Sequence, residues 1–116
     1  MVIVVDDDDA VREALAFTLE MEGFGVECLG SGEALLMHAL PARGTCLLID
    51  ERLPGISGFE ALLKLRDRNV TLPAVLMTSH PDQALRSAAR AAGVPILEKP
   101  LFGDVMTLAI RAALRT

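Results

Sequence analysis

Five short apolar runs alternate with segments of helical periodicity along the chain. The runs are rich in Val, Ile and Leu and lack alternation of polar and apolar residues, which is typical of strands buried on both faces of a parallel sheet. They cover residues 2–5, 24–29, 45–49, 73–77 and 94–97. Apolar residues recur every three or four positions in the helices predicted over 9–22, 31–40, 61–65, 81–92 and 104–114. This order predicts an α/β fold, a doubly wound (βα)5 domain in which a five-stranded parallel sheet carries helices on both faces.

Capping and breaking residues support these segments. Ser57 and Glu60 have the three-residue spacing of a capping box. Pro81 suits the first turn of the fourth helix, and Gly93 provides its C-terminal stop. We therefore expect the fourth helix to begin at Pro81 and to end just before Gly93.

Composition narrows the class of protein. The 116 residues are enough for one domain, which we place at 1–116, and a hydrophobic content of 52% excludes a disordered chain. The net charge of −5 argues against direct nucleic-acid binding by this domain. There is no apolar run long enough to cross a membrane and no signal peptide, so we expect a cytoplasmic protein without a membrane contact. Cys28 and Cys46 lack a metal-binding spacing, and we expect two buried thiols.

Polar residues follow four of the predicted strands. Asp6 and Asp7 follow the first strand, Asp50 the third, Thr78 the fourth and Lys99 the fifth. Ligands of open α/β sheets bind beyond the carboxyl ends of the strands, where the fold brings these residues together. The neighbouring Asp8 and Asp9 are interpreted as N-terminal residues of the first helix.

Three carboxylates at one edge need a cation or a raised pKa, because two such charges about 4 Å apart repel by about 4 kcal/mol at an effective dielectric of about 20. A hard divalent ion that prefers oxygen ligands, Mg²⁺ first, suits the cluster. A metal, a carboxylate nucleophile, a hydroxyl and an ammonium group together are the equipment for moving a phosphoryl group onto a carboxylate.

Four motifs in this order resemble the receiver domain of two-component response regulators. They are Val-Val-Asp-Asp at 4–7, Leu-Ile-Asp at 48–50 with Leu-Pro-Gly-Ile-Ser-Gly at 53–58, Met-Thr-Ser at 77–79, and Glu-Lys-Pro at 98–100. The resemblance covers essentially the whole chain, and the sequences of the motifs are most similar to those of receivers of FixJ-type regulators. It implies the flavodoxin-like fold of the bacterial chemotaxis regulator.

The resemblance implies a role for each site residue. Asp50 would accept the phosphoryl group, Lys99 would pair with its oxygens, and Thr78 would turn its hydroxyl toward it. The Lys99–Pro100 bond would be cis.

The same resemblance implies a Mg²⁺ site. Asp7 would bind the ion directly, Asp6 through water, and Asp50 and the backbone carbonyl of Arg52 would complete the protein ligands.

Partners also follow from the resemblance. The phosphoryl donor would be a sensor histidine kinase, a phosphotransfer protein or a small molecule such as acetyl phosphate. FixJ-type regulators usually carry a helix-turn-helix output domain for transcription regulation, so the chain is expected to be a stand-alone receiver or part of a longer regulator. A phosphorylation-dependent homodimer would use the face of the fourth helix and fifth strand, including Arg86, Arg90, Ile96 and parts of 105–111. The family's usual aromatic switch residue aligns with Ile96, so a ring flip cannot operate.

The expected function is a switch that reacts once per phosphoryl group and is not a dedicated enzyme, and three other functions compete with it. A pseudo-receiver, an interaction module that never takes phosphate, would lack one of the site residues, and all are present. A small Mg²⁺-dependent phosphatase with an Asp nucleophile needs a further acid–base group and a lid over its substrate pocket. Glu51, next to Asp50, could be the acid–base group, but a chain of 116 residues leaves little room for a lid. A flavodoxin-like cofactor binder needs a phosphate loop after the first strand, where this chain has four aspartates.

Overall fold

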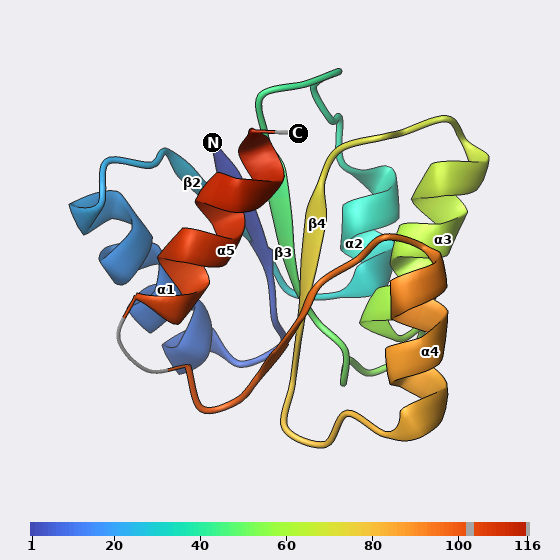
Figure 1. The fold of residues 1–116 in the computed structure, drawn as a ribbon. Helices are drawn as coiled ribbons and strands as arrows, with labels where there is room; N and C mark the ends of the chain where they lie inside the picture. Colours follow the sequence, from blue (N-terminus) through green and yellow to red (C-terminus); the bar gives the residue numbers. More distant parts are fainter. Residues whose placement is uncertain (102–103, 116) are drawn as a thin grey trace.

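A five-stranded parallel sheet forms the centre of the protein in a computed structural model that describes residues 1–101 and 104–115 (Figure 1). The strand order is β2-β1-β3-β4-β5. In chain order the elements are β1 (Val2–Val5), α1 (Asp9–Met21), β2 (Val26–Leu29), α2 (Gly32–Met37), β3 (Cys46–Asp50), α3 (Gly58–Asp67), β4 (Ala74–Thr78), α4 (Gln83–Ala91), β5 (Ile96–Glu98) and α5 (Val105–Leu114). The predicted (βα)5 architecture is confirmed.

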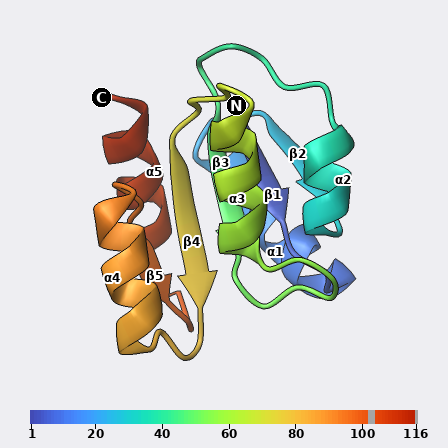
Figure 2. The same ribbon diagram turned by 90° about the vertical axis from the view of Figure 1, so that its right-hand side faces the viewer.

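Successive residues of the central strands pack on opposite faces of the sheet. Ile49 of β3 lies in the apolar cluster that α2, α3 and α4 cover, whereas its neighbour Leu48 lies in the cluster that α1 and α5 cover. Figures 1 and 2 show these two helical layers on either side of the sheet. β1, β3 and β4 are buried along their whole length, which explains why their sequences are apolar up to the polar residues that end β3 and β4, Asp50 and Thr78.

Local capping sets the helix ends, and the structure corrects three predicted helices. The third helix covers Gly58–Asp67 instead of 61–65. Ser57 and Glu60 form the predicted capping box at the start of α3. The second helix ends at Met37 instead of residue 40, because His38 already has an extended backbone (ψ 139°). The fourth helix does not begin at Pro81. Asp82 is its N-cap and accepts a hydrogen bond from the Leu85 amide, so the proline lies outside the helix.

The two cysteines differ in their surroundings. Cys46 on β3 is buried, and burial raises the pKa of its thiol to about 12. Cys28 is exposed on the edge strand β2, so the prediction of two buried thiols was wrong for this residue. An edge strand has a neighbour on one side only, which a local apolar pattern does not reveal.

Across residues 1–101 and 104–115, none of the helices combines the length and apolar character that a membrane crossing requires.

Candidate functional site

The carboxyl ends of β1, β3, β4 and β5 surround a cavity of about 320 Å³. All six residues predicted for the site line it: Asp6, Asp7, Asp50, Arg52, Thr78 and Lys99. The fold therefore brings together groups that are separated by more than 90 positions in the sequence.

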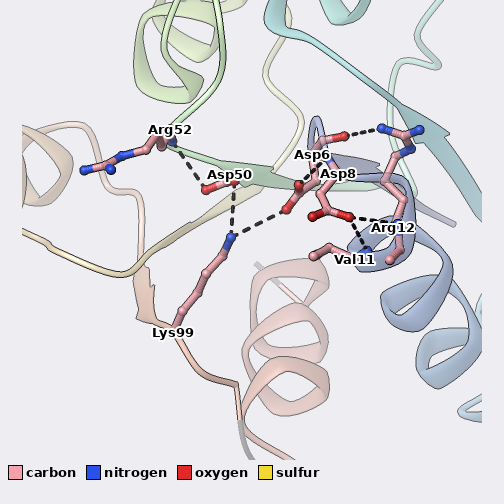
Figure 3. Close-up of polar contacts among 8 residues, drawn as sticks. Asp6, Asp8, Val11, Arg12, Asp50, Arg52 and Lys99 are labelled. Atoms are coloured by element: carbon pink, nitrogen blue, oxygen red, sulfur yellow. Dashed lines mark hydrogen bonds and ion pairs between the residues drawn. The ribbon is translucent and has the colours of Figure 1, made fainter.

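Asp50 is the last residue of β3, and its side chain is only 9% exposed. Its Oδ2 lies 3.2 Å from Lys99 Nζ, and its Oδ1 accepts a hydrogen bond from the Arg52 amide at 3.3 Å (Figure 3). Burial raises the pKa of the Asp50 carboxyl, and the ammonium group of Lys99 opposes this rise. The buried carboxylate thus depends on Lys99 for its charge compensation.

Lys99 also approaches Asp6. Its Nζ lies 3.5 Å from Asp6 Oδ2, which is within ion-pair distance, but this buried oxygen receives no hydrogen bond. The other oxygen, Oδ1, accepts from the Asp8 amide at 3.0 Å. The side chain of Asp6 is 2% exposed, so its Oδ2 is a buried acceptor with unused capacity.

The donor atoms fit a divalent cation. One carboxylate oxygen from each of Asp6, Asp7 and Asp50 lies within 4.8 Å of the other two. These are hard oxygen ligands of the kind that Mg²⁺ prefers, and the unsatisfied Oδ2 of Asp6 is one of the atoms such an ion would satisfy. Asp7 is exposed at the mouth of the site, whereas the other two carboxylates are buried.

Thr78 is the buried last residue of β4. Its Oγ1 accepts a hydrogen bond from the His80 amide at 3.4 Å, and its main-chain carbonyl accepts from the Lys99 amide at 2.8 Å. The hydroxyl retains its own proton for donation to a group in the cavity. The Lys99–Pro100 peptide is cis, as expected.

The loop after Asp50 packs closely against the start of α3. A Cβ at Gly58 would lie 2.4 Å from the Asp50 carbonyl oxygen, so only glycine fits there. Glu51 Oε1 accepts from the Phe59 amide at 2.8 Å, and burial raises the pKa of this carboxyl. Glu51 is therefore engaged with the start of α3 and does not serve as a free acid–base group.

Asp8 and Arg12 show where the sequence analysis succeeded and where it missed a contact. Asp8 is the N-cap of α1, as interpreted, and accepts from the amides of Ala10 and Val11. Arg12 was not singled out, yet its Nη1 donates to the Asp6 carbonyl oxygen at 2.6 Å (Figure 3). Its position one turn into the helix that follows the aspartate run is the signal that points to it.

Residues 2–111 match the family described as the response regulator receiver domain, and the chain belongs to this family. It is 42% identical over 112 residues to the transcriptional regulatory protein FixJ of Azorhizobium caulinodans, covering 96% of this chain and 53% of the relative. It is 40% identical to FixJ of Rhizobium meliloti, covering 95% of this chain and 54% of that protein. The chain thus spans about half the length of these curated relatives.

Solved structures agree with the family. The structure of FixJ-N has a TM-score of 0.88 at 38% identity, covering 98% of this chain and 92% of that one. The response regulator StyR has a TM-score of 0.90 at 36% identity, covering 98% of this chain and 58% of that one. The chain is a receiver domain of the FixJ type of two-component response regulator, and neither the pseudo-receiver nor the phosphatase alternative is favoured.

Proposed function

We propose that residues 1–116 form one receiver domain in which Asp50 takes a phosphoryl group from a histidine kinase or a phosphotransfer protein in a Mg²⁺-dependent reaction. The observation that carries the proposal is the placement of Asp50, with Lys99 at 3.2 Å on one side and the carboxylate oxygens of Asp6 and Asp7 within 4.8 Å. This is the arrangement that a carboxylate nucleophile for phosphoryl transfer requires.

The transfer is an in-line displacement. An Asp50 carboxylate oxygen attacks the phosphorus, the bond from phosphorus to the donor's imidazole nitrogen breaks, and the imidazole leaves with the electron pair. Mg²⁺, held by Asp6, Asp7, Asp50 and the Arg52 main-chain carbonyl, would offset the negative charge on the phosphoryl oxygens. Lys99 Nζ lies beside the nucleophile and adds a second positive charge there.

Lys99 also helps to keep the carboxyl group of Asp50 ionised. Only the ionised carboxylate attacks, and burial raises the pKa of Asp50 toward the neutral form. The ammonium group of Lys99 counteracts that shift, so the same side chain keeps Asp50 reactive before transfer and pairs with the phosphoryl oxygens afterwards.

The signal would leave the site through β4. Thr78 pairs with Glu98 in the β4–β5 register, and Ile96 pairs with Leu76 two residues earlier. A hydrogen bond from the Thr78 hydroxyl to the phosphoryl group would draw in the end of β4. This favours a second arrangement of the neighbouring α4–β5 face without an aromatic ring flip.

The α4–β5 face is the proposed surface for phosphorylation-dependent homodimerisation. Arg86, Arg90 and Ile96 line a shallow cavity there, and Arg86 Nη2 lies 3.4 Å from Glu98 Oε1. The exposed arginines suit acidic residues across a two-fold axis. Sedimentation of the protein with and without a phosphoryl donor checks this part, and Arg90→Glu is expected to keep the phosphorylated domain monomeric.

In this function the domain acts as a cytoplasmic switch that reacts once with each phosphoryl group. Its curated relatives are transcriptional regulators, which supports an output in transcription through a further domain or partner. No direct contact with nucleic acid is proposed for this acidic domain.

Mapping the modified residue tests the proposed function. The protein is incubated with acetyl phosphate and Mg²⁺, the acyl phosphate is reduced with borohydride, and the peptides are analysed by mass spectrometry. We expect homoserine at position 50 alone. Modification at another carboxylate, with position 50 unchanged, would overturn the assignment of Asp50.

A further inference from the structure

Arg12 reaches from α1 back to the end of β1. Its Nη1 donates to the Asp6 main-chain carbonyl at 2.6 Å (Figure 3). Its Nη2 contacts the carboxylate of Asp9. The Arg12 side chain is 21% exposed, whereas that of Asp9 is 84% exposed. The hydrogen bond from Arg12 to the carbonyl is therefore the more buried of the two contacts, and the ion pair with Asp9 lies at the surface.

The Asp6 carbonyl occupies a place where regular strand pairing ends. The β1–β2 register runs to Val5 and Leu29, and the Asp6 amide still donates to the Leu29 carbonyl at 3.1 Å. Beyond Leu29 the chain leaves the sheet at Gly30, where a Cβ would lie 3.4 Å from Arg12 Nη1. The guanidinium thus fills the space after the last β2 residue and supplies a donor to the end of β1.

We propose that Arg12 is a positioning residue for the cation site. The carbonyl that it binds belongs to the peptide joining Asp6 to Asp7, so fixing this peptide restricts the directions of both carboxylates. Arg12 touches neither the cation nor the phosphoryl group. This inference rests on the proposed function, because it assumes that Asp6 and Asp7 bind Mg²⁺.

The direction in which Mg²⁺ affinity changes when Arg12 is removed distinguishes a positioning role from a purely electrostatic one. A guanidinium near the carboxylates repels a cation, so as a charge alone Arg12 would weaken Mg²⁺ binding, and its removal would tighten it. A residue that orients the ligands has the opposite effect. Loss of such outer contacts typically weakens metal binding about 10–100-fold.

Calorimetric titration with Mg²⁺ alone tests the proposal on the full chain. Arg12→Met keeps the apolar stem of the side chain and removes both donor and charge. We expect its Kd for Mg²⁺ to rise about tenfold. Arg12→Lys restores a donor and is expected to have a Kd between those of Arg12→Met and the wild type.

Arg68→Met is the matched control. Arg68 Nη1 donates to the Leu36 main-chain carbonyl at 2.8 Å, so the variant removes the same kind of contact outside the site. We expect an unchanged Kd. Circular dichroism verifies folding of each variant, and if Arg12→Met does not fold, Arg12→Gln, whose side chain is too short to reach the carbonyl, is judged by the same criterion.

The outcomes distinguish failure of the Mg²⁺ site from failure of the positioning role of Arg12. Failure of the wild type to bind Mg²⁺ would refute the proposed metal site itself. Wild-type binding together with equal or tighter binding by the folded Arg12 variant would overturn the positioning role and leave the proposed function standing. Weaker binding by Arg12→Met, but not by Arg68→Met, supports the positioning role.

Discussion

Removing the charge of Asp50 is expected to stabilise the metal-free domain while abolishing its reaction. Asp50 is buried beside Asp6 at the end of β3, and Asp50→Asn replaces its carboxylate by a neutral amide of the same shape. The amide oxygen can still accept the hydrogen bond from the Arg52 amide. The substitution therefore changes charge and leaves packing nearly constant.

The distances give the magnitude. Oxygens of Asp50 and Asp6 within 4.8 Å repel by about 3.5 kcal/mol at an effective dielectric of about 20, and Lys99 at 3.2 Å attracts Asp50 by about 5 kcal/mol. These contributions largely offset each other, so burial decides the balance, in line with the raised pKa of Asp50. We expect Asp50→Asn to increase the free energy of unfolding by about 1–2 kcal/mol, or Tm by about 4–8 °C.

The pH dependence has a definite sign. The pKa of Asp50 in the folded protein lies above its ordinary value of 3.8, so the wild type loses stability as pH rises from 3.8 through the folded pKa. The advantage of Asp50→Asn is therefore absent below pH 3.8 and complete above the folded pKa. Mg²⁺ reduces the difference in stability between Asp50→Asn and the wild type, because it binds the folded wild type more tightly than the folded variant.

Thermal unfolding in EDTA, followed by circular dichroism from pH 4 to pH 8, measures this difference. Asp67→Asn, at an exposed position of α3, is the control and is expected to change stability by less than about 0.5 kcal/mol. If Asp50→Asn is no more stable than the wild type at pH 7.5, or if its advantage is as large at pH 4 as at pH 8, the buried charge of Asp50 does not destabilise the folded domain.

Three further substitutions probe the site. Lys99→Ala should slow phosphorylation by acetyl phosphate about 10²-fold, because the charge beside Asp50 is lost, whereas Lys64→Ala on the exposed part of α3 should leave the rate unchanged in the same mass-spectrometric assay. Gly58→Ala should lower the free energy of unfolding by about 2 kcal/mol or more in urea titration, because its Cβ would lie 2.4 Å from the Asp50 carbonyl oxygen; unchanged stability would contradict this contact. Thr78→Ala should still be phosphorylated but should lose the phosphorylation-dependent NMR shifts of α4 and β5, and their persistence would show that the hydroxyl does not transmit the signal.

The fold was predictable because its strands are unusually uniform. β1, β3 and β4 are buried on both faces, so an unbroken apolar run at each was sufficient to identify them. Helix ends were harder to predict. A proline in a favourable position suggested that α4 begins at Pro81, but the capping hydrogen bond of Asp82 sets its start.

The composition of the site was also predictable, since strand ends in a parallel sheet converge. Contacts that depend on side-chain direction were not. Nothing in the local sequence shows that Lys99 lies between Asp50 and Asp6, or that Arg12 turns back to a carbonyl of β1. The exposure of Cys28 depends on its place at the edge of the sheet, which follows from strand order and not from its own segment.

Intact-mass spectrometry after incubation with acetyl phosphate tests whether Asp50 accepts a phosphoryl group in a Mg²⁺-dependent reaction. The wild type is measured with Mg²⁺ and with EDTA, beside Asp50→Asn with Mg²⁺. We expect a single phosphoryl adduct on the wild type with Mg²⁺ and none in the other two samples. An adduct of equal yield on Asp50→Asn would contradict the claim that this carboxylate at the end of β3 is the phosphoacceptor.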